Sequence, residues 1–92
     1  MPKFGWDKAK AERNCRRHNV TFEAATRVFE DPFYIDEIDD REGYGEERSN
    51  IIGMADGRLL VVTYTLRSGV TRIISARLAE PHESRRYHEA KR

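Results

Sequence analysis

The sequence is short of cysteine and of long hydrophobic runs, and each shortage excludes a class of protein. Cys15 is the single cysteine among 92 residues, so an internal disulfide is impossible, and a lone thiol is typical of a reducing cytoplasm. The longest apolar run, residues 59–62, is far shorter than the ~20 residues of a transmembrane helix. The opening MPKFGWDK also lacks the apolar core of a signal peptide. We therefore expect a cytoplasmic protein that makes no membrane contact.

Recognisable metal, phosphate and nucleophile motifs are missing as well. No C-x-x-C or H-E-x-x-H pattern occurs, and the three histidines are not spaced as metal ligands. The G-x-G of Gly43 and Gly45 is surrounded by acidic residues, which would repel a phosphate. Ser75 has no glycine elbow around it. We expect no metal site, no cofactor and no serine triad.

Charge is abundant but unevenly distributed. The net charge is only +1. However, residues 1–20 carry six Lys/Arg against two acids, residues 21–47 carry two against ten, and residues 48–92 carry nine against four. The basic segments are either ordinary solvated faces or an anion-binding face from which the acidic segment loops away.

Capping residues and apolar spacing predict three helices. Asp7 and Thr21 are suitable N-caps for helices over residues 8–19 and 22–30, and Asn19 suits a left-handed C-terminal position. In the first helix, the i, i+4, i+7 spacing of Ala11, Cys15 and His18 predicts a narrow buried stripe. The last helix is expected over residues 82–92, with Pro81 in its first turn.

Five strands complete a single α+β domain over residues 1–92. They are expected at residues 3–6, 33–38, 48–55, 58–67 and 70–79, with an acidic loop at 39–47. The order β-α-α-β-β-β-β-α predicts an antiparallel sheet with the helices packed on one face. The other face is then partly open and, because several arginines lie on the strands, suits a polyanion.

The hairpin at Ser68-Gly69 decides which arginines share a face of the sheet. Arg72 and Arg77 are five residues apart, so in a regular strand they point to opposite sides unless a bulge intervenes. A two-residue Ser68-Gly69 loop pairs Thr65 with Arg72 and places Arg77 opposite Leu60, diagonal to Arg58.

A three-residue loop that includes Arg67 gives a different pairing. Tyr64 then pairs with Arg72, Arg58 shares the face of Arg72, and Arg77 turns to the other side. We favour this bulged turn. In either register two arginines meet on one face, where Glu47, Glu83 or Glu89 could neutralise them, or a phosphodiester could.

Several short motifs follow one another along the chain. They are a W-D-x-x-K-A opening, an E-E-R strand, G-R-L-L and R-I-I-S-A-R. They lie within the stretches FGWDKAKAERNCRRHNVTFEAATRVFEDP (4–32), EERSNIIGMADGRLLVVTYTLR (46–67) and RIISARLAEPHESRRY (72–87). In this order the stretches resemble the BrnT family of ribonuclease toxins from bacterial type II toxin–antitoxin systems. Asn19 stands where glycine is usual in the family.

The resemblance implies a RelE-like fold and RNA cleavage that blocks translation and arrests growth. It also implies a BrnA-type antitoxin with a ribbon-helix-helix DNA-binding part, so we expect a chain that is monomeric alone and joins a larger complex with that partner. Toxins of this fold use arginines or lysines on the sheet rather than a metal. A non-catalytic module that binds nucleic acid or protein is the alternative.

The resemblance also selects candidate site residues, of which Arg58 and Arg72 are preferred for holding the scissile phosphate. His18 is expected to be packed rather than catalytic. The candidates for catalysis are Arg58, Arg72, Arg77, Glu47 and Tyr64, and those for RNA binding are Arg48, Arg67 and Tyr87.

Overall fold

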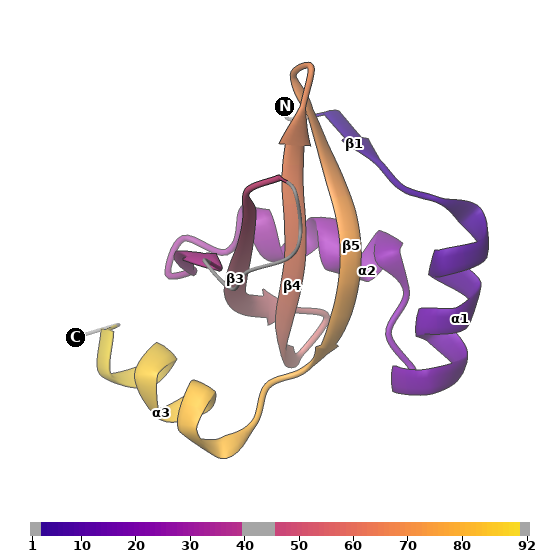
Figure 1. The fold of residues 1–92 in the computed structure, drawn as a ribbon. Coiled ribbons are helices and arrows are strands. Elements are labelled where there is room, and N and C mark those ends of the chain that lie inside the picture. Colours follow the sequence, from indigo (N-terminus) through magenta and orange to yellow (C-terminus); the bar gives the residue numbers. More distant parts are fainter. Residues whose placement is uncertain (1–2, 40–45, 91–92) are drawn as a thin grey trace.

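The described residues of the chain fold into a five-stranded sheet with three α-helices and one short 3-10 helix (Figure 1). The structure, a computed structural model, describes residues 3–39 and 46–90, so most of the expected acidic loop and the last two residues of the expected final helix lie outside it. The elements are β1 (Lys3–Gly5), α1 (Lys8–His18), α2 (Phe22–Arg27), η1 (Val28–Glu30), β2 (Ile35–Asp39), β3 (Arg48–Ala55), β4 (Arg58–Arg67), β5 (Val70–Leu78) and α3 (Pro81–Ala90). The predicted order β-α-α-β-β-β-β-α is confirmed.

The sheet has the strand order β1-β5-β4-β3-β2 and is mixed rather than purely antiparallel. Strands β2 to β5 form an antiparallel meander, as expected. Strand β1 lies parallel to β5, where Gly5 pairs with Arg72. The first and last strands of the chain therefore lie side by side.

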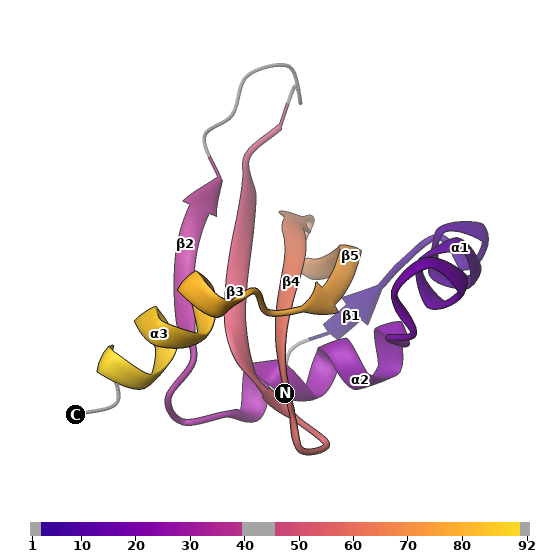
Figure 2. The ribbon, with the colours of Figure 1, turned by 90° about the horizontal axis from the view of Figure 1, so that it is seen from below.

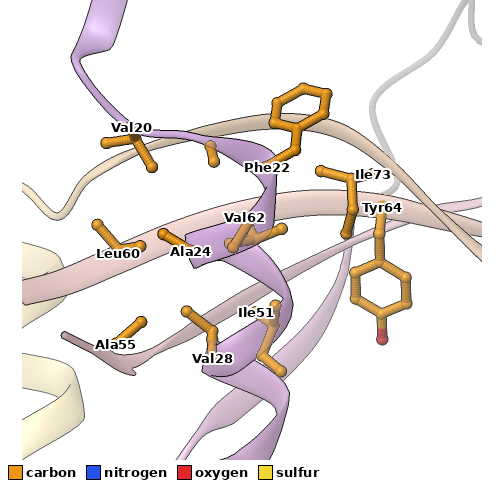
Figure 3. Packing of buried hydrophobic residues seen from close by; sticks show 12 residues of the cluster. Val20, Phe22, Ala24, Val28, Ile51, Ala55, Leu60, Val62, Tyr64 and Ile73 are labelled. Atoms are coloured by element: carbon orange, nitrogen blue, oxygen red, sulfur yellow. The ribbon is translucent and has the colours of Figure 1, made fainter. Parts of the chain in front are cut away.

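Helices cover both faces of the sheet, which corrects the expectation of one covered face (Figure 2). Helices α1 and α2 cover the side that carries Ile51, Leu60 and Val62, which we call the α1–α2 face (Figure 3). Tyr87 of α3 packs on Ile52 and Val61 from the opposite side, the α3 face. Alternation along the strands explains the division, because successive residues point to opposite faces and both faces carry apolar residues.

The capping predictions for the first two helices are confirmed. The Asp7 carboxylate accepts hydrogen bonds from the backbone N–H groups of Ala9 and Lys10, and the Thr21 hydroxyl accepts one from Ala24. Asn19 has φ 56°, the left-handed conformation that ends α1. Of the helices that the structure describes, none has the length and apolar character of a membrane span.

The β4–β5 turn consists of the two residues Ser68 and Gly69, so the favoured three-residue loop is wrong. Both residues have positive φ, 52° and 78°, as in the tight turns that match the twist of antiparallel strands. Thr65 therefore pairs with Arg72, and Tyr64 does not.

A bulge in β5 then changes the side of the sheet to which Arg77 points. Tyr64 pairs with Ile73 while Thr63 pairs with Ser75, which leaves Ile74 as the extra residue. Because one extra residue reverses the alternation, Arg77 lies opposite Val61 instead of Leu60. Arg72 and Arg77 consequently share the α3 face, whereas the pairing of Arg58 with Ala55 keeps Arg58 on the α1–α2 face.

Asn14 of α1 completes the hydrogen bonding of β5 beyond the point where β1 ends. Its Nδ2 donates to the carbonyls of Ala76 (2.8 Å) and Val20 (3.1 Å), and its Oδ1 accepts from the backbone N–H of Ala76 (3.1 Å). The Asn14 side chain thus makes the two hydrogen bonds to the backbone of Ala76 that a neighbouring strand would otherwise make. It is the buried residue of α1, whereas Ala11, Cys15 and His18 of the predicted stripe are half-buried, and Ala11 packs against the core.

Candidate functional site

Residues of four neighbouring strands lie in a row on the α3 face, in the part of the sheet that α3 does not cover. Thr65 of β4 lies opposite Arg72 of β5, which in turn pairs with Gly5 of β1. On the other side of Thr65, Arg48 of β3 immediately precedes Ser49, the partner of Tyr64. Strand pairing therefore brings together residues that are far apart in the chain, with two arginines flanking a buried threonine.

These residues surround a small hollow of ≈ 80 Å³, which we call the arginine hollow. Four cationic side chains and two carboxylates line it, an excess of two positive charges: Lys10, Arg48, Arg67, Arg72, Asp7 and Glu46. Guanidinium groups around a concave surface favour a phosphate, because each planar group can donate two parallel hydrogen bonds to its oxygens.

Gly5 leaves space for the guanidinium of Arg72, and Thr65 anchors the segment before β3. A Cβ at Gly5 would lie 3.7 Å from Nη1 of Arg72, so the guanidinium lies over the backbone of β1. The Thr65 hydroxyl donates to the carbonyl of Glu47 at 2.7 Å, which attaches the segment before β3 to β4. The Glu47 side chain is exposed, and the neighbouring Glu46 is the one that lines the hollow.

Glu46 and Arg67 form an ion pair at the rim of the hollow. The Nη2 group of Arg67 donates to both carboxylate oxygens of Glu46, at 3.0 and 3.1 Å. Both side chains are partly exposed, so the pair contributes little to stability but holds a carboxylate beside the arginines.

Arg58, one of the two preferred phosphate ligands, lies far from this arrangement. Its Nη1 donates to the carbonyl of Asn19 at 3.0 Å, between the β3–β4 turn and the end of α1. Because Arg58 and Arg72 are on opposite faces of the sheet, they do not hold one phosphate together.

Arg77 is engaged in a structural ion pair. Its guanidinium donates to both oxygens of Glu83, each at 2.8 Å, and this joins the end of β5 to the first turn of α3. The hydrogen bond from Arg77 holds the pKa of the Glu83 carboxyl below its usual value. Of the anions suggested by the sequence, Glu83 is the one that neutralises this arginine.

The two candidate tyrosines are buried outside the hollow. The Tyr64 hydroxyl donates to Asp36 at 2.6 Å on the α1–α2 face, and burial together with this hydrogen bond raises its pKa (Figure 3). Tyr87 is 1% exposed and donates to Asp31, so its ring does not present a stacking surface to RNA. Burial, assisted by that hydrogen bond, raises the pKa of Tyr87 to about 12.

One group of residues in the described part of the chain has the spacing of metal ligands, although the sequence motifs predicted none. Ligand atoms of Glu80, His82 and Glu83 lie within 4.8 Å of one another at the start of α3. Glu83 already binds Arg77 and accepts a hydrogen bond from the backbone N–H of Glu80 at 2.8 Å. A cation would therefore compete with an existing ion pair.

Comparison with protein families identifies the chain. The model of the family described as ribonuclease toxin, BrnT, of type II toxin–antitoxin systems matches residues 6–83. The chain belongs to the BrnT family of ribonuclease toxins. A comparison with curated protein sequences found no match.

Three residues that line the arginine hollow belong to motifs of the sequence but were not recognised there as candidate site residues. Asp7 and Lys10 belong to the W-D-x-x-K-A opening, and Glu46 is the first residue of E-E-R. The structure brings all three to the arginine hollow. The position of Lys10 follows from the attachment of α1 to β5 by Asn14, which sequence spacing does not reveal.

Proposed function

We propose that this BrnT-family chain is a metal-independent endoribonuclease whose active site is the arginine hollow. The observation that carries the proposal is the convergence of Lys10, Arg48, Arg67 and Arg72 around one concave surface of the sheet. This arrangement supports binding of a scissile phosphate and stabilisation of the charge that develops on it.

In the proposed reaction, the 2′-hydroxyl of the RNA attacks the adjacent phosphorus. The O2′–P bond forms, the P–O5′ bond breaks, a base accepts the 2′-hydroxyl proton, and the leaving O5′ takes up a proton. Because the nucleophile belongs to the substrate, the protein needs only to orient the phosphate, stabilise its charge and move protons.

Arg72 is the proposed principal phosphate ligand, because strand pairing and Gly5 place its guanidinium at the centre of the row. Arg48 and Arg67 assist it from β3 and β4. Glu46 is the proposed base in place of Glu47 or Tyr64, because its carboxylate lines the hollow and Arg67 holds it there.

The cellular consequence of the proposed activity is inhibition of translation and growth arrest. Family membership supports a cognate antitoxin. The partner that we propose is a BrnA-type ribbon-helix-helix protein, which neutralises the toxin by direct contact in a larger complex.

Replacement of Arg72 by alanine tests the proposed site. Loss of a charge-stabilising donor should lower the rate of RNA cleavage by about 10²- to 10³-fold and relieve growth arrest. Arg72→Lys keeps the charge but loses the bidentate geometry, so it should retain part of the activity. Arg58→Ala, on the opposite face, is the matched control and should remain toxic.

The same assay with and without EDTA tests the metal-independent mechanism. Cleavage that EDTA abolishes would show that a metal takes part. RNA that stays intact with the unmodified protein would favour the alternative, a non-catalytic binding module. An Arg72→Ala variant that cleaves RNA normally would show that the arginine hollow is not the active site.

A further inference from the structure

A second and larger concave surface lies between α1 and β5. Strand β1 pairs with β5 only from Val70 to Arg72, and α1 lies beside β5 after that (Figure 1). A groove of ≈ 480 Å³ remains between the helix and the strand, and we call it the α1 groove. Its strand side is formed at the bulge by Ile74 and Ser75, and its helix side is formed mainly by Lys10, Arg13, Arg16, Arg17 and His18.

The α1 groove is basic throughout. Four formal positive charges line it, and its described lining contains no carboxylate. Among the residues that the structure describes, Arg13, Arg16 and Arg17 make no ion pair, and all three are exposed. The groove therefore presents a concentrated positive potential to any ligand that enters it.

Helix stability alone does not account for this charge. Arg16 and Arg17 are in the last turn of α1, where cations interact favourably with the helix dipole. Arg13 lies a turn earlier, and its spacing of three from Arg16 and four from Arg17 places like charges side by side, which destabilises a helix. An external anion would offset this repulsion.

The α1 groove is continuous with the arginine hollow. Lys10 and Ile74 line both, so the two concave surfaces adjoin each other beside β5. From Lys10 to Arg17 the helix extends the basic surface by about 10 Å, at a rise of 1.5 Å per residue. A single phosphate would occupy only one end of this path, whereas a chain of phosphates would follow it.

We propose that the α1 groove binds the phosphate backbone of single-stranded RNA next to the phosphate held in the arginine hollow. The choice of RNA rests on the proposed function. Positively charged grooves that follow a flexible backbone are the usual means of binding single strands. Arg13 and Arg17 contact flanking phosphates, and Lys10 connects them to the arginine hollow.

The test compares two double variants of equal charge change by fluorescence anisotropy. Arg13→Gln/Arg17→Gln removes two charges from the α1 groove, and Lys8→Gln/Arg85→Gln removes two exposed charges outside its lining. The probe is a single strand of about 12 nucleotides. Its 2′-hydroxyls are methylated, so binding is measured whether or not the protein cleaves RNA. A dinucleotide, which has one phosphate, reports the arginine hollow alone.

The groove variant should bind the long strand about 25-fold more weakly at 0.1 M salt. The slope of the logarithm of the binding constant against the logarithm of the salt concentration should be smaller in magnitude by about 1.4. Both values are those expected for the loss of two phosphate contacts to a single strand. Dinucleotide binding and the control variant should change by less than about threefold, because neither Lys8 nor Arg85 lines the α1 groove or the arginine hollow. Circular dichroism should confirm that α1 stays folded.

Two results would overturn the proposal. The first is unchanged affinity of the groove variant for the long strand, and the second is an equal loss in the two double variants. If the first result were accompanied by lost affinity for the antitoxin, the α1 groove would belong to the protein partner. None of these results depends on whether Arg72→Ala abolishes cleavage, so the active-site proposal and this one fail separately.

Discussion

Replacement of Asn14 by leucine should destabilise the protein far more than its position on a charged helix suggests. Leucine keeps a branched side chain of similar length but can neither donate nor accept a hydrogen bond. The change would leave the N–H of Ala76 without its acceptor and would remove a donor from the carbonyls of Ala76 and Val20. Asn14 is 8% exposed, so water has little access to these groups.

The expected loss can be worked out from these three contacts. A buried polar group that loses its partner costs about 1–3 kcal/mol, and the N–H of Ala76 should bear the full cost. The two carbonyls can find other donors more easily, so the total should be about 3 kcal/mol. A domain of this size is stable by roughly 5–14 kcal/mol, and such a loss would lower Tm by about 12–24 °C.

Urea unfolding followed by circular dichroism measures this loss. The matched control is Asn50→Leu, because Asn50 is only half-buried and its bonds, to Thr63 (2.6 Å) and Asp39 (3.4 Å), join side chains. The control should lose about 1 kcal/mol or less. If Asn14→Leu lost no more than Asn50→Leu at an unchanged m-value, the reasoning that Asn14 acts in place of a strand would be wrong.

Two further changes test the attachment of α3 to the sheet. Tyr87→Phe removes the buried hydrogen bond to Asp31 and should cost about 1.5 kcal/mol at neutral pH. Because the pKa of Tyr87 is raised from 10.0 to about 12, the unmodified protein should lose stability as pH rises from 10 to 12. The variant should retain only the alkaline loss due to other tyrosines, and urea midpoints across this range would detect the difference. Glu83→Gln removes the pair with Arg77 and should cost about 1 kcal/mol at pH 7, a value reduced for the partial exposure of Arg77. Since the pKa of Glu83 is lowered from 4.5, its stabilisation is present above that pH and is lost as pH falls below it. The stability difference should therefore narrow in acid, and a constant difference between pH 7 and pH 3 would contradict this assignment.

Much of the fold could be predicted from local sequence signals. Asp7 and Thr21 cap the helices as expected, and β3 and β4 have the predicted bounds. These features depend on interactions within a few residues, which the sequence displays directly. The pairing of β1 with β5 joins strands that are far apart in the sequence, and no local signal indicated its parallel direction.

The candidate site was predicted less completely, and the β5 bulge is the reason. The odd spacing of Arg72 and Arg77 was recognised, but the extra residue Ile74 reverses its consequence and places both on the α3 face. Arg58 then lies on the other face, although its motif made it a preferred candidate. Glu46 lines the hollow instead of its neighbour Glu47, a choice that depends on the ion pair with Arg67.

The sequence by itself determined the helices, the strands and membership of the BrnT family, because residue type and short-range spacing control these features. The tertiary structure alone decided which cations meet. Arg48, Arg67 and Arg72 lie on three strands and Lys10 on a helix, so their convergence depends on register, on the bulge and on the bonds of Asn14 to Ala76. A shift of one residue in any pairing would turn these side chains to the opposite face, and that sensitivity is why spacing along the chain did not reveal the site.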